Sequence, residues 1–442
     1  MCTFKITNDP NQTILDQYLK LGGPTASKTI NVGGVYITHN LLSITGEVVI
    51  QPVKYGNKYY MLLGEIYNYD DSWDSDIYFG IEKYLEHGDK FTEYLDGEFL
   101  FIVYDLETKI IDLFTDPWST RQCFYYKVEE HFYFSTFPMR EPEDGRFNKE
   151  PSIDPVWNNE FFRIPHNSHY RYDVISNKLT PINTELHEWN LIQYKDNLDD
   201  VISAFETAVL KRYTDNITLF LSGGLDSSSI AMCLADHKKH FNSITLSLND
   251  SEDNETIQQV LEYTKPYNTN YKITENNELT DKTYIENRNF LRESKCRGRS
   301  QLRMRETVIS KFNSKVVFMG NGGDEIVESY MTKDKSDFSI WPEDLTTIFP
   351  WKHFYGGQTR RLLDLHETLS LAYGLELRNI FYDKSLTQEW LHIVPEIKNQ
   401  TPKVFQKLYF YNRGIKLPEK ISGFGSQVRD NEYTHLKPTP YK

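Results

Sequence analysis

Short runs of apolar residues, broken by turn-forming residues, dominate the first part of the chain. Residues 59–63, 99–104 and 131–135 have the composition of strands, and several such runs are bounded by Gly, Asp or Asn. Residues 76–87 instead place apolar side chains three and four positions apart, which predicts a helix. The pattern predicts a layered, β-rich domain of the α+β class over residues 1–185.

The second part of the chain alternates between strand and helix patterns. A helix is expected over 196–213, directly before a strand over 217–221. Further strands are expected at 243–248, 271–274 and 315–319, and further helices at 255–263, 303–312 and 359–373. This alternation predicts an α/β domain over residues 195–442, with a parallel sheet covered on both faces and a helical C-terminal part.

Polar and glycine-rich segments follow three of these strands, at Ser222, Asn249 and Gly320. Ligands of parallel sheets bind beyond the carboxyl ends of the strands, so these segments are expected to share one edge. Residues 249–255 are acidic, and Asp253 and Glu255 belong either to a ligand site at this edge or to a solvated turn.

The segment 222–227 reads Ser-Gly-Gly-Leu-Asp-Ser, between a strand and a helix that starts near Ser227. Free N–H groups in such a turn, and the positive end of the helix dipole, make an anion site, and serine hydroxyls can donate to phosphate oxygens. A lysine-containing Walker loop is absent from the sequence. A turn without a ligand is the alternative. The candidate residues for phosphate binding are Ser222, Gly223, Gly224, Asp226, Ser227, Ser247 and Gly320.

A second turn, 320–325, reads Gly-Asn-Gly-Gly-Asp-Glu and follows a buried strand. Carboxylates in this position suit Mg²⁺, a hard cation that binds one or two carboxylates together with substrate phosphates. The metal would neutralise charge on the bound phosphates. Asp226 and Asp324 are the candidate metal ligands.

Length and composition set broad limits. A chain of 442 residues exceeds one compact core, which favours two domains. The net charge of −14 and the lack of a long Lys/Arg run argue against nucleic-acid binding. No apolar stretch reaches membrane-spanning length and the N-terminus lacks a signal-peptide core, so we expect a cytoplasmic protein with no membrane partner. The four cysteines form neither a disulfide framework nor a Cys-x-x-Cys pair.

Several motifs carry a family resemblance. The segment 222–227 resembles the pyrophosphate loop of ATP pyrophosphatases, which cleave ATP between the α and β phosphates. Removal of Met1 would make Cys2 an N-terminal nucleophile whose own amine acts as the base. The stretches 64–68 (Gly-Glu-Ile-Tyr-Asn) and 95–99 (Leu-Asp-Gly-Glu-Phe), and the segment from Asp116 to Tyr126, resemble class II glutamine amidotransferases. In this order, the motifs resemble the glutamine-dependent asparagine synthetase family.

The resemblance implies an Ntn-hydrolase-like first domain and an ATP-pyrophosphatase second domain. It implies an ATP-dependent amide-forming ligase, with ATP and Mg²⁺ as cofactors and small-molecule substrates, namely an amino acid carboxylate such as aspartate and glutamine or ammonia. The resemblance is compatible with a homodimer but does not decide the oligomeric state. By the same resemblance, Cys2 and Lys420 are catalytic, and Gly64, Glu65 and Asp76 bind glutamine. It also makes Asp253 and Glu255 candidate adenosine or metal ligands. The resemblance places Lys420 before a glycine-containing loop, where an ammonium group would stabilise negative charge on the adenylate and pyrophosphate.

The segment 22–25, which reads Gly-Gly-Pro-Thr where the family has Arg-Gly-Pro-Asp, and three single positions depart from the family pattern. Leu41 stands where an Arg grips the glutamine carboxylate, and Leu63 stands where an Asn supplies an oxyanion donor. Asn321 replaces a Glu that lies beside the aspartyl substrate in the family. These departures keep open a lactam or peptide cyclase with an inactive glutaminase domain, and a non-catalytic protein that retains the scaffold. Arg378 is expected to pair with Glu376, with Asp383 or with a substrate carboxylate.

Overall fold

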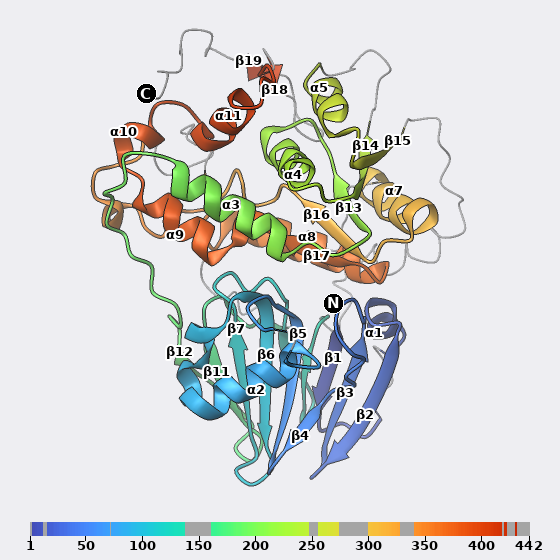
Figure 1. Cartoon of the computed structure of the whole chain (residues 1–442). Coiled ribbons are helices and arrows are strands. Elements are labelled where there is room, and N and C mark those ends of the chain that lie inside the picture. The colour runs from blue at the N-terminus through green and yellow to red at the C-terminus, as the bar shows by residue number, and fades with distance from the viewer. Residues whose placement is uncertain are drawn as a thin grey trace.

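The computed structural model shows an antiparallel β half below and an α/β half above (Figure 1). The structure describes residues 2–11, 16–70, 72–137, 161–246, 255–273, 299–327, 340–417, 420–421 and 429–430. Cys2 opens the described chain beside the boundary between the halves, where Figure 1 marks the N-terminus.

The first half contains two six-stranded antiparallel sheets. One sheet has the order β10-β8-β9-β1-β3-β2, and the other has the order β12-β11-β7-β6-β5-β4. The strands of the first sheet are β1 (Thr3–Thr7), β2 (Ala26–Val32), β3 (Val35–Leu41), β8 (Phe124–Val128), β9 (His131–Ser135) and β10 (Phe162–Arg163). Those of the second are β4 (Val53–Tyr55), β5 (Lys58–Ile66), β6 (Gly97–Asp105), β7 (Ile110–Thr115), β11 (His169–Asp173) and β12 (Lys178–Asn183).

The alternation of apolar side chains explains how these sheets stack. Phe4 and Ile37 of one sheet and Leu100 and Leu113 of the other belong to one buried apolar cluster between them. A second cluster packs helix α2 (Asp76–His87) and the short helix η1 (Gly88–Tyr94) against the outer face of the second sheet. Helix α1 (Asp16–Gly22) lies beside β1, whose Thr3 hydroxyl donates to the Leu19 carbonyl. The predicted β-rich half, its three named strands and the helix over 76–87 are confirmed.

The second half contains a parallel five-stranded sheet with the order β15-β14-β13-β16-β17. Its strands are β13 (Ile217–Phe220), β14 (Phe241–Leu246), β15 (Asn268–Ile273), β16 (Val316–Met319) and β17 (Glu376–Asn379). Its helices are α3 (Asp199–Lys211), α4 (Leu225–Asp236), α5 (Glu255–Thr264), α7 (Arg299–Thr307), α8 (Gly357–Ala372), α9 (Lys384–His392), α10 (Pro395–Lys398) and α11 (Val404–Tyr411), with the shorter helices η2 (Val308–Phe312), η3 (Leu345–Thr347) and η4 (Ile380–Tyr382). The predicted parallel sheet is thereby confirmed.

The predicted elements of this half differ from the observed ones mainly at their ends. Helix α4 begins at Leu225, earlier than the expected start near Ser227, because Gly224 already takes the extended conformation of a helix cap. The helix expected over 303–312 consists of α7 followed by a π-helical segment. Strand β17 adds a fifth strand that apolar patterning alone does not reveal, since it includes Glu376, Arg378 and Asn379, all buried.

Buried polar and aromatic contacts join the halves. Glu98 of β6 accepts hydrogen bonds from the backbone N–H of Asn379 (2.9 Å) and from Nε of Arg212 (2.8 Å). A mixed apolar cluster combines Leu19 and Tyr126 of the first half with Leu369 of α8. Within the described part of the chain, no helix is long and apolar enough to cross a membrane.

Candidate active site

The turn 222–227 connects β13 to α4 and is organised by its own serines. The Ser222 N–H donates to Oγ of Ser227 (3.1 Å), and the Gly224 N–H donates to Oγ of Ser222 (3.3 Å). Gly223 has a φ of +76°, which favours glycine at this position. The turn thus presents serine hydroxyls and the start of a 12-residue helix at the carboxyl end of a central strand.

The turn 320–325 follows the neighbouring strand β16 and packs directly on this helix start. A Cβ on Gly320 would lie 2.9 Å from Cβ of Asp226, and one on Gly323 would lie 2.3 Å from Oδ1 of Asp226. Glycine is required at positions 320 and 323 because this turn is in direct contact with Asp226. Ser222 and Gly320 therefore share one edge of the sheet, as predicted, whereas Ser247, Asn249 and Asp253 lie outside the described residues.

Lys403 joins the two candidate metal ligands. Its Nζ lies 2.5 Å from Oδ2 of Asp226 and 2.5 Å from Oδ1 of Asp324. Gln406, one turn along α11, donates to Oδ1 of Asp226 (3.1 Å). Sequence reasoning did not identify Lys403, which is 177 positions from Asp226 and lies in no recognised motif.

The charges of this cluster depend on burial. Burial raises the pKa of Asp226 to about 6, while Lys403 opposes the rise and Asp324 adds to it. Burial alone would lower the pKa of Lys403, but the two carboxylates raise it well above its usual range, so the ammonium group stays charged. One positive charge thus faces two carboxylates.

The acidic pair at 324–325 divides into two roles. The Asp324 side chain is 36% exposed and faces Lys403, so it is accessible to a ligand. Glu325 is buried, and its Oε2 accepts the Gly322 N–H (3.0 Å) while its backbone carbonyl accepts Nε1–H of Trp351 (2.8 Å). Glu325 shapes the turn, and Asp324 is the acid that a metal ion could reach.

Mg²⁺ fits this donor set. Asp226 and Asp324 converge on one cation, Lys403, and Asp324 is partly open to solvent. Among the described residues no group of three His, Cys, Asp or Glu side chains could hold a metal. A Mg²⁺ ion that takes its remaining ligands from water and substrate phosphates needs only one or two carboxylates.

Cys2, in contrast, lies in an apolar environment. It is one step before the Thr3–Asn40 pair of β1 and β3, and it is therefore opposite Leu41. Cys2, Leu41 and Leu63 are all buried in the same apolar cluster between the sheets. Burial raises the pKa of the Cys2 thiol to about 11, so the thiolate required for attack is disfavoured.

The three predicted glutamine-binding residues have structural partners. A Cβ on Gly64, whose φ is +109°, would lie 1.8 Å from the Glu98 carbonyl oxygen. Oδ2 of Asp76 accepts the Ile66 N–H (3.1 Å), and burial raises the pKa of Asp76 to about 6. Oε1 of Glu65 lies 3.0 Å from Nη2 of Arg378 in the second half.

Arg378 lies between two acidic side chains, the buried Glu376 and the partly buried Glu65. Its Nε donates to Oε1 of Glu376 (2.7 Å), and Glu65 lies on its other side. Burial raises the pKa of Glu65 to about 8, with Arg378 opposing the rise. Burial alone would raise the pKa of Glu376, but neighbouring positive charges, Arg378 among them, lower it well below its usual range. Of the partners predicted for Arg378, the structure shows Glu376, whereas Asp383 pairs with Arg212 (2.7 Å).

Two further predicted residues are described in part. Lys420 begins the short strand β18 (Lys420–Ile421), which pairs with β19 (Arg429–Asp430), but its side chain lies outside the described structure. Glu255 is exposed at the first position of α5.

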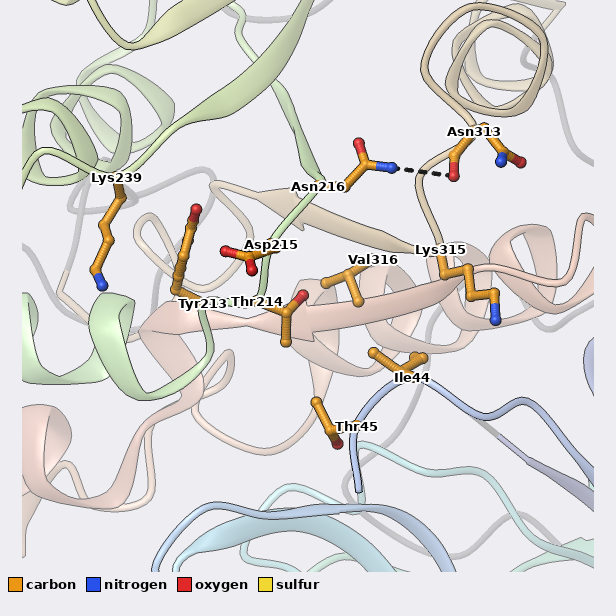
Figure 2. A pocket seen from close by; sticks show the side chains of 10 residues that line it. All are labelled: Ile44, Thr45, Tyr213, Thr214, Asp215, Asn216, Lys239, Asn313, Lys315 and Val316. Carbon is orange, nitrogen blue, oxygen red and sulfur yellow. Dashed lines mark hydrogen bonds between the residues drawn. The ribbon is translucent and has the colours of Figure 1, made fainter. Parts of the chain in front are cut away.

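A separate pocket of about 660 Å³ lies at the opposite end of the parallel sheet (Figure 2). Figure 2 shows Asn216 before β13, Lys315 and Val316 at β16, and Ile44 and Thr45 from the first half. Nζ of Lys315 already donates to the Ser43 carbonyl (2.8 Å). Because this pocket faces the amino ends of the strands and lacks paired carboxylates, it is not the candidate ATP site.

Comparisons with known proteins agree with these features. Residues 200–390 match the family model described as asparagine synthase. A putative glutamine-hydrolysing asparagine synthetase of Methanocaldococcus jannaschii is 27% identical over 224 residues, which cover 45% of this chain and 40% of that protein. The asparagine synthetases of Asparagus officinalis and Mesocricetus auratus are each 24% identical, and the matches cover 88% and 95% of this chain and 67% and 81% of those proteins.

Solved structures give weaker similarity. Glutamine phosphoribosylpyrophosphate amidotransferase from B. subtilis is 9% identical, with coverage of 72% of this chain and 90% of that chain and a TM-score of 0.32. NMN synthetase from Francisella tularensis is 12% identical, and the match covers 49% of this chain and 84% of that chain with a TM-score of 0.22. TM-scores this low do not establish a shared fold. By sequence, residues 200–390 are similar to the asparagine synthase family, and most of the chain is similar to glutamine-hydrolysing asparagine synthetases. These similarities support a ligase enzyme.

Proposed function

We propose that this protein is an ATP-dependent amide-forming ligase that activates a carboxylate, aspartate by its relationship, and transfers the acyl group to ammonia. The observation that carries this proposal is the cluster of Asp226, Lys403 and Asp324 beside the turn 222–227, at the carboxyl ends of adjacent parallel strands. The relatives described above are asparagine synthetases, so they give no support to the cyclase alternative.

In the proposed reaction, the turn 222–227 binds the triphosphate through N–H groups and the hydroxyls of Ser222 and Ser227. Asp226 and Asp324 would hold Mg²⁺, which supplies charge neutralisation of the phosphates. A substrate carboxylate oxygen attacks the α-phosphorus, and the bond to the bridging oxygen breaks to release pyrophosphate. Ammonia then attacks the acyl carbon and AMP leaves.

Lys403 gives the cluster a defined charge before substrate binds. Its ammonium group, paired with both carboxylates, keeps two acids together that would otherwise repel each other. When phosphates arrive, the same ammonium can stabilise negative charge that develops on the leaving pyrophosphate. In this proposal Lys420 acts from the segment after α11, and Ser247 and Gly320 complete the nucleotide site.

The proposed domains follow from these assignments. Residues 195–442 form the ligase domain, and residues 1–185 form a degenerate Ntn-hydrolase-like domain. Free ammonium is the proposed nitrogen donor, because Cys2 is buried opposite Leu41 and its thiol pKa is raised to about 11. Loss of one oxyanion donor, here at Leu63, typically costs about 10²–10³ in rate.

The test is release of pyrophosphate and AMP from Mg-ATP with aspartate, supplied with ammonium or with glutamine. We expect turnover and asparagine formation with ammonium, and little or none with glutamine. Turnover that is faster with glutamine would overturn the proposed nitrogen donor. Absence of turnover with both donors would overturn aspartate as the substrate.

A further inference from the structure

Trp118 belongs to the first half by sequence but to the second half by packing. It lies in the segment after β7 and is 1% exposed. Its ring is 5.4 Å from that of Trp189, 6.0 Å from that of Phe354 and 5.7 Å from that of Tyr382, centroid to centroid. Trp118 is part of the main apolar core of the second half.

Tyr382 connects Trp118 to the candidate active site. A Cβ on Gly322 would lie 3.1 Å from two ring carbons of Tyr382 and 2.9 Å from Cβ of Phe381, so the backbone at Gly322 rests on these side chains. The adjacent Gly323 contacts the Asp226 carboxylate, as described above. The order of contact is therefore Trp118, Tyr382, the turn 320–325 and Asp226.

The segment that carries Trp118 is held rigidly on both sides. Within the first half, Asp116 accepts the N–H groups of Trp118 (2.8 Å), Thr120 (3.0 Å) and Phe99 (3.0 Å). Across the boundary, Arg360 of α8 donates to the Trp118 carbonyl (2.9 Å). These hydrogen bonds fix the backbone that carries the Trp118 ring, and the surrounding aromatic rings pack around the ring itself.

We propose that Trp118 is a positioning residue: through Tyr382, it fixes the turn 320–325 against Asp226, so that the first half is needed for nucleotide binding by the second. This inference rests on the proposed function, because it takes the Asp226 cluster as the Mg-ATP site. It gives the first half a role that does not require Cys2 to react.

The test uses the full chain and titrates Mg-ATP by calorimetry into the wild type and the variants W118L, W118F and F91L. W118L removes the aromatic contact, and we expect about tenfold weaker binding. W118F keeps a smaller ring, and we expect about threefold weaker binding. Aromatic pairs contribute beyond their buried area, which is the reason for the graded loss.

F91L is the matched control, since Phe91 is a fully buried aromatic residue that packs on Phe101 and Phe114 within the first half. We expect wild-type affinity for F91L despite a loss of thermal stability. Wild-type affinity in folded W118L or W118F, or an equal loss in F91L, would overturn the inference. If W118L does not fold, the comparison of W118F with F91L decides. Failure of the wild type to bind Mg-ATP would instead overturn the proposed function.

Discussion

The substitution K403M removes the ammonium group that lies between Asp226 and Asp324 and keeps a side chain of similar length. In the wild type the Nζ–carboxylate distances are both 2.5 Å, and the side chains of Lys403 and Asp226 are 11% and 13% exposed. Removal of one partner from a buried ion pair costs about 3–5 kcal/mol. Because the Asp324 side chain is 36% exposed, solvent screens part of this cost. We therefore expect K403M to lower the free energy of unfolding by about 2 kcal/mol near pH 8.

The loss of stability in K403M is expected to be larger at high pH than at low pH, because it depends on the ionisation of Asp226. Burial raises the pKa of Asp226 to about 6, and Lys403 opposes that rise, so K403M raises this pKa further. A carboxyl group whose pKa is raised in the folded state lowers the free energy of unfolding at pH values above that pKa. This loss disappears as the pH falls toward the pKa that the group has in the unfolded chain. The deficit of K403M relative to the wild type should therefore shrink to less than about 1 kcal/mol near pH 5.

Urea denaturation followed by tryptophan fluorescence, without nucleotide, measures this deficit at the two pH values. The double variant D226N/K403M is the control, since it removes the buried charge together with its partner. It should recover most of the loss near pH 8. A deficit of the same size at both pH values, or no recovery in the double variant, would refute the electrostatic account of the cluster.

Three further predictions concern the remaining ionisable groups. C2A should keep ammonium-dependent turnover within about twofold of the wild type, because the thiol is buried and protonated; a loss above tenfold would contradict this. E65Q should lower the free energy of unfolding by under about 1 kcal/mol at pH 7, since Glu65 keeps its proton to about pH 8. E376Q should lower it by about 3 kcal/mol, because this substitution removes the ionised partner of Arg378. Urea midpoints in the opposite order would disprove that assignment. Calorimetric Mg-ATP affinity should fall as the pH drops through about 6, where Asp226 gains a proton; constant affinity from pH 8 to 5 would argue against Asp226 as a ligand.

Local patterns predicted the elements and much of the candidate site. Residues 76–87 form the expected helix because their apolar spacing matches one helix face. The strand, turn and helix around Ser222 follow from an apolar run, two glycines and four serines. Their shared edge with Gly320 follows from parallel pairing of β13 and β16.

Long-range partners could not be predicted in this way. Lys403 approaches Asp226 only through the packing of α11 on the second half, and its surrounding sequence has no motif. Asp324 and Glu325 are adjacent acids, and the burial of Glu325 and its hydrogen bond from Gly322, which identify it as the structural one, are not readable from the sequence. The strand β17 could not be predicted from apolar patterning, because three of its four residues are polar. They are buried in a strand where Arg378 pairs with Glu376.

The central claim, that the cluster of Asp226, Lys403 and Asp324 binds Mg-ATP, is tested most directly by calorimetric titration of ATP into the wild type and D324N, each with Mg²⁺ and with EDTA. Asp324 is partly exposed, so its replacement should leave the fold intact. We predict that Mg²⁺ strengthens ATP binding by the wild type and that D324N loses most of this gain, at least tenfold. Equal Mg²⁺-dependent affinity in the two proteins would contradict the claim.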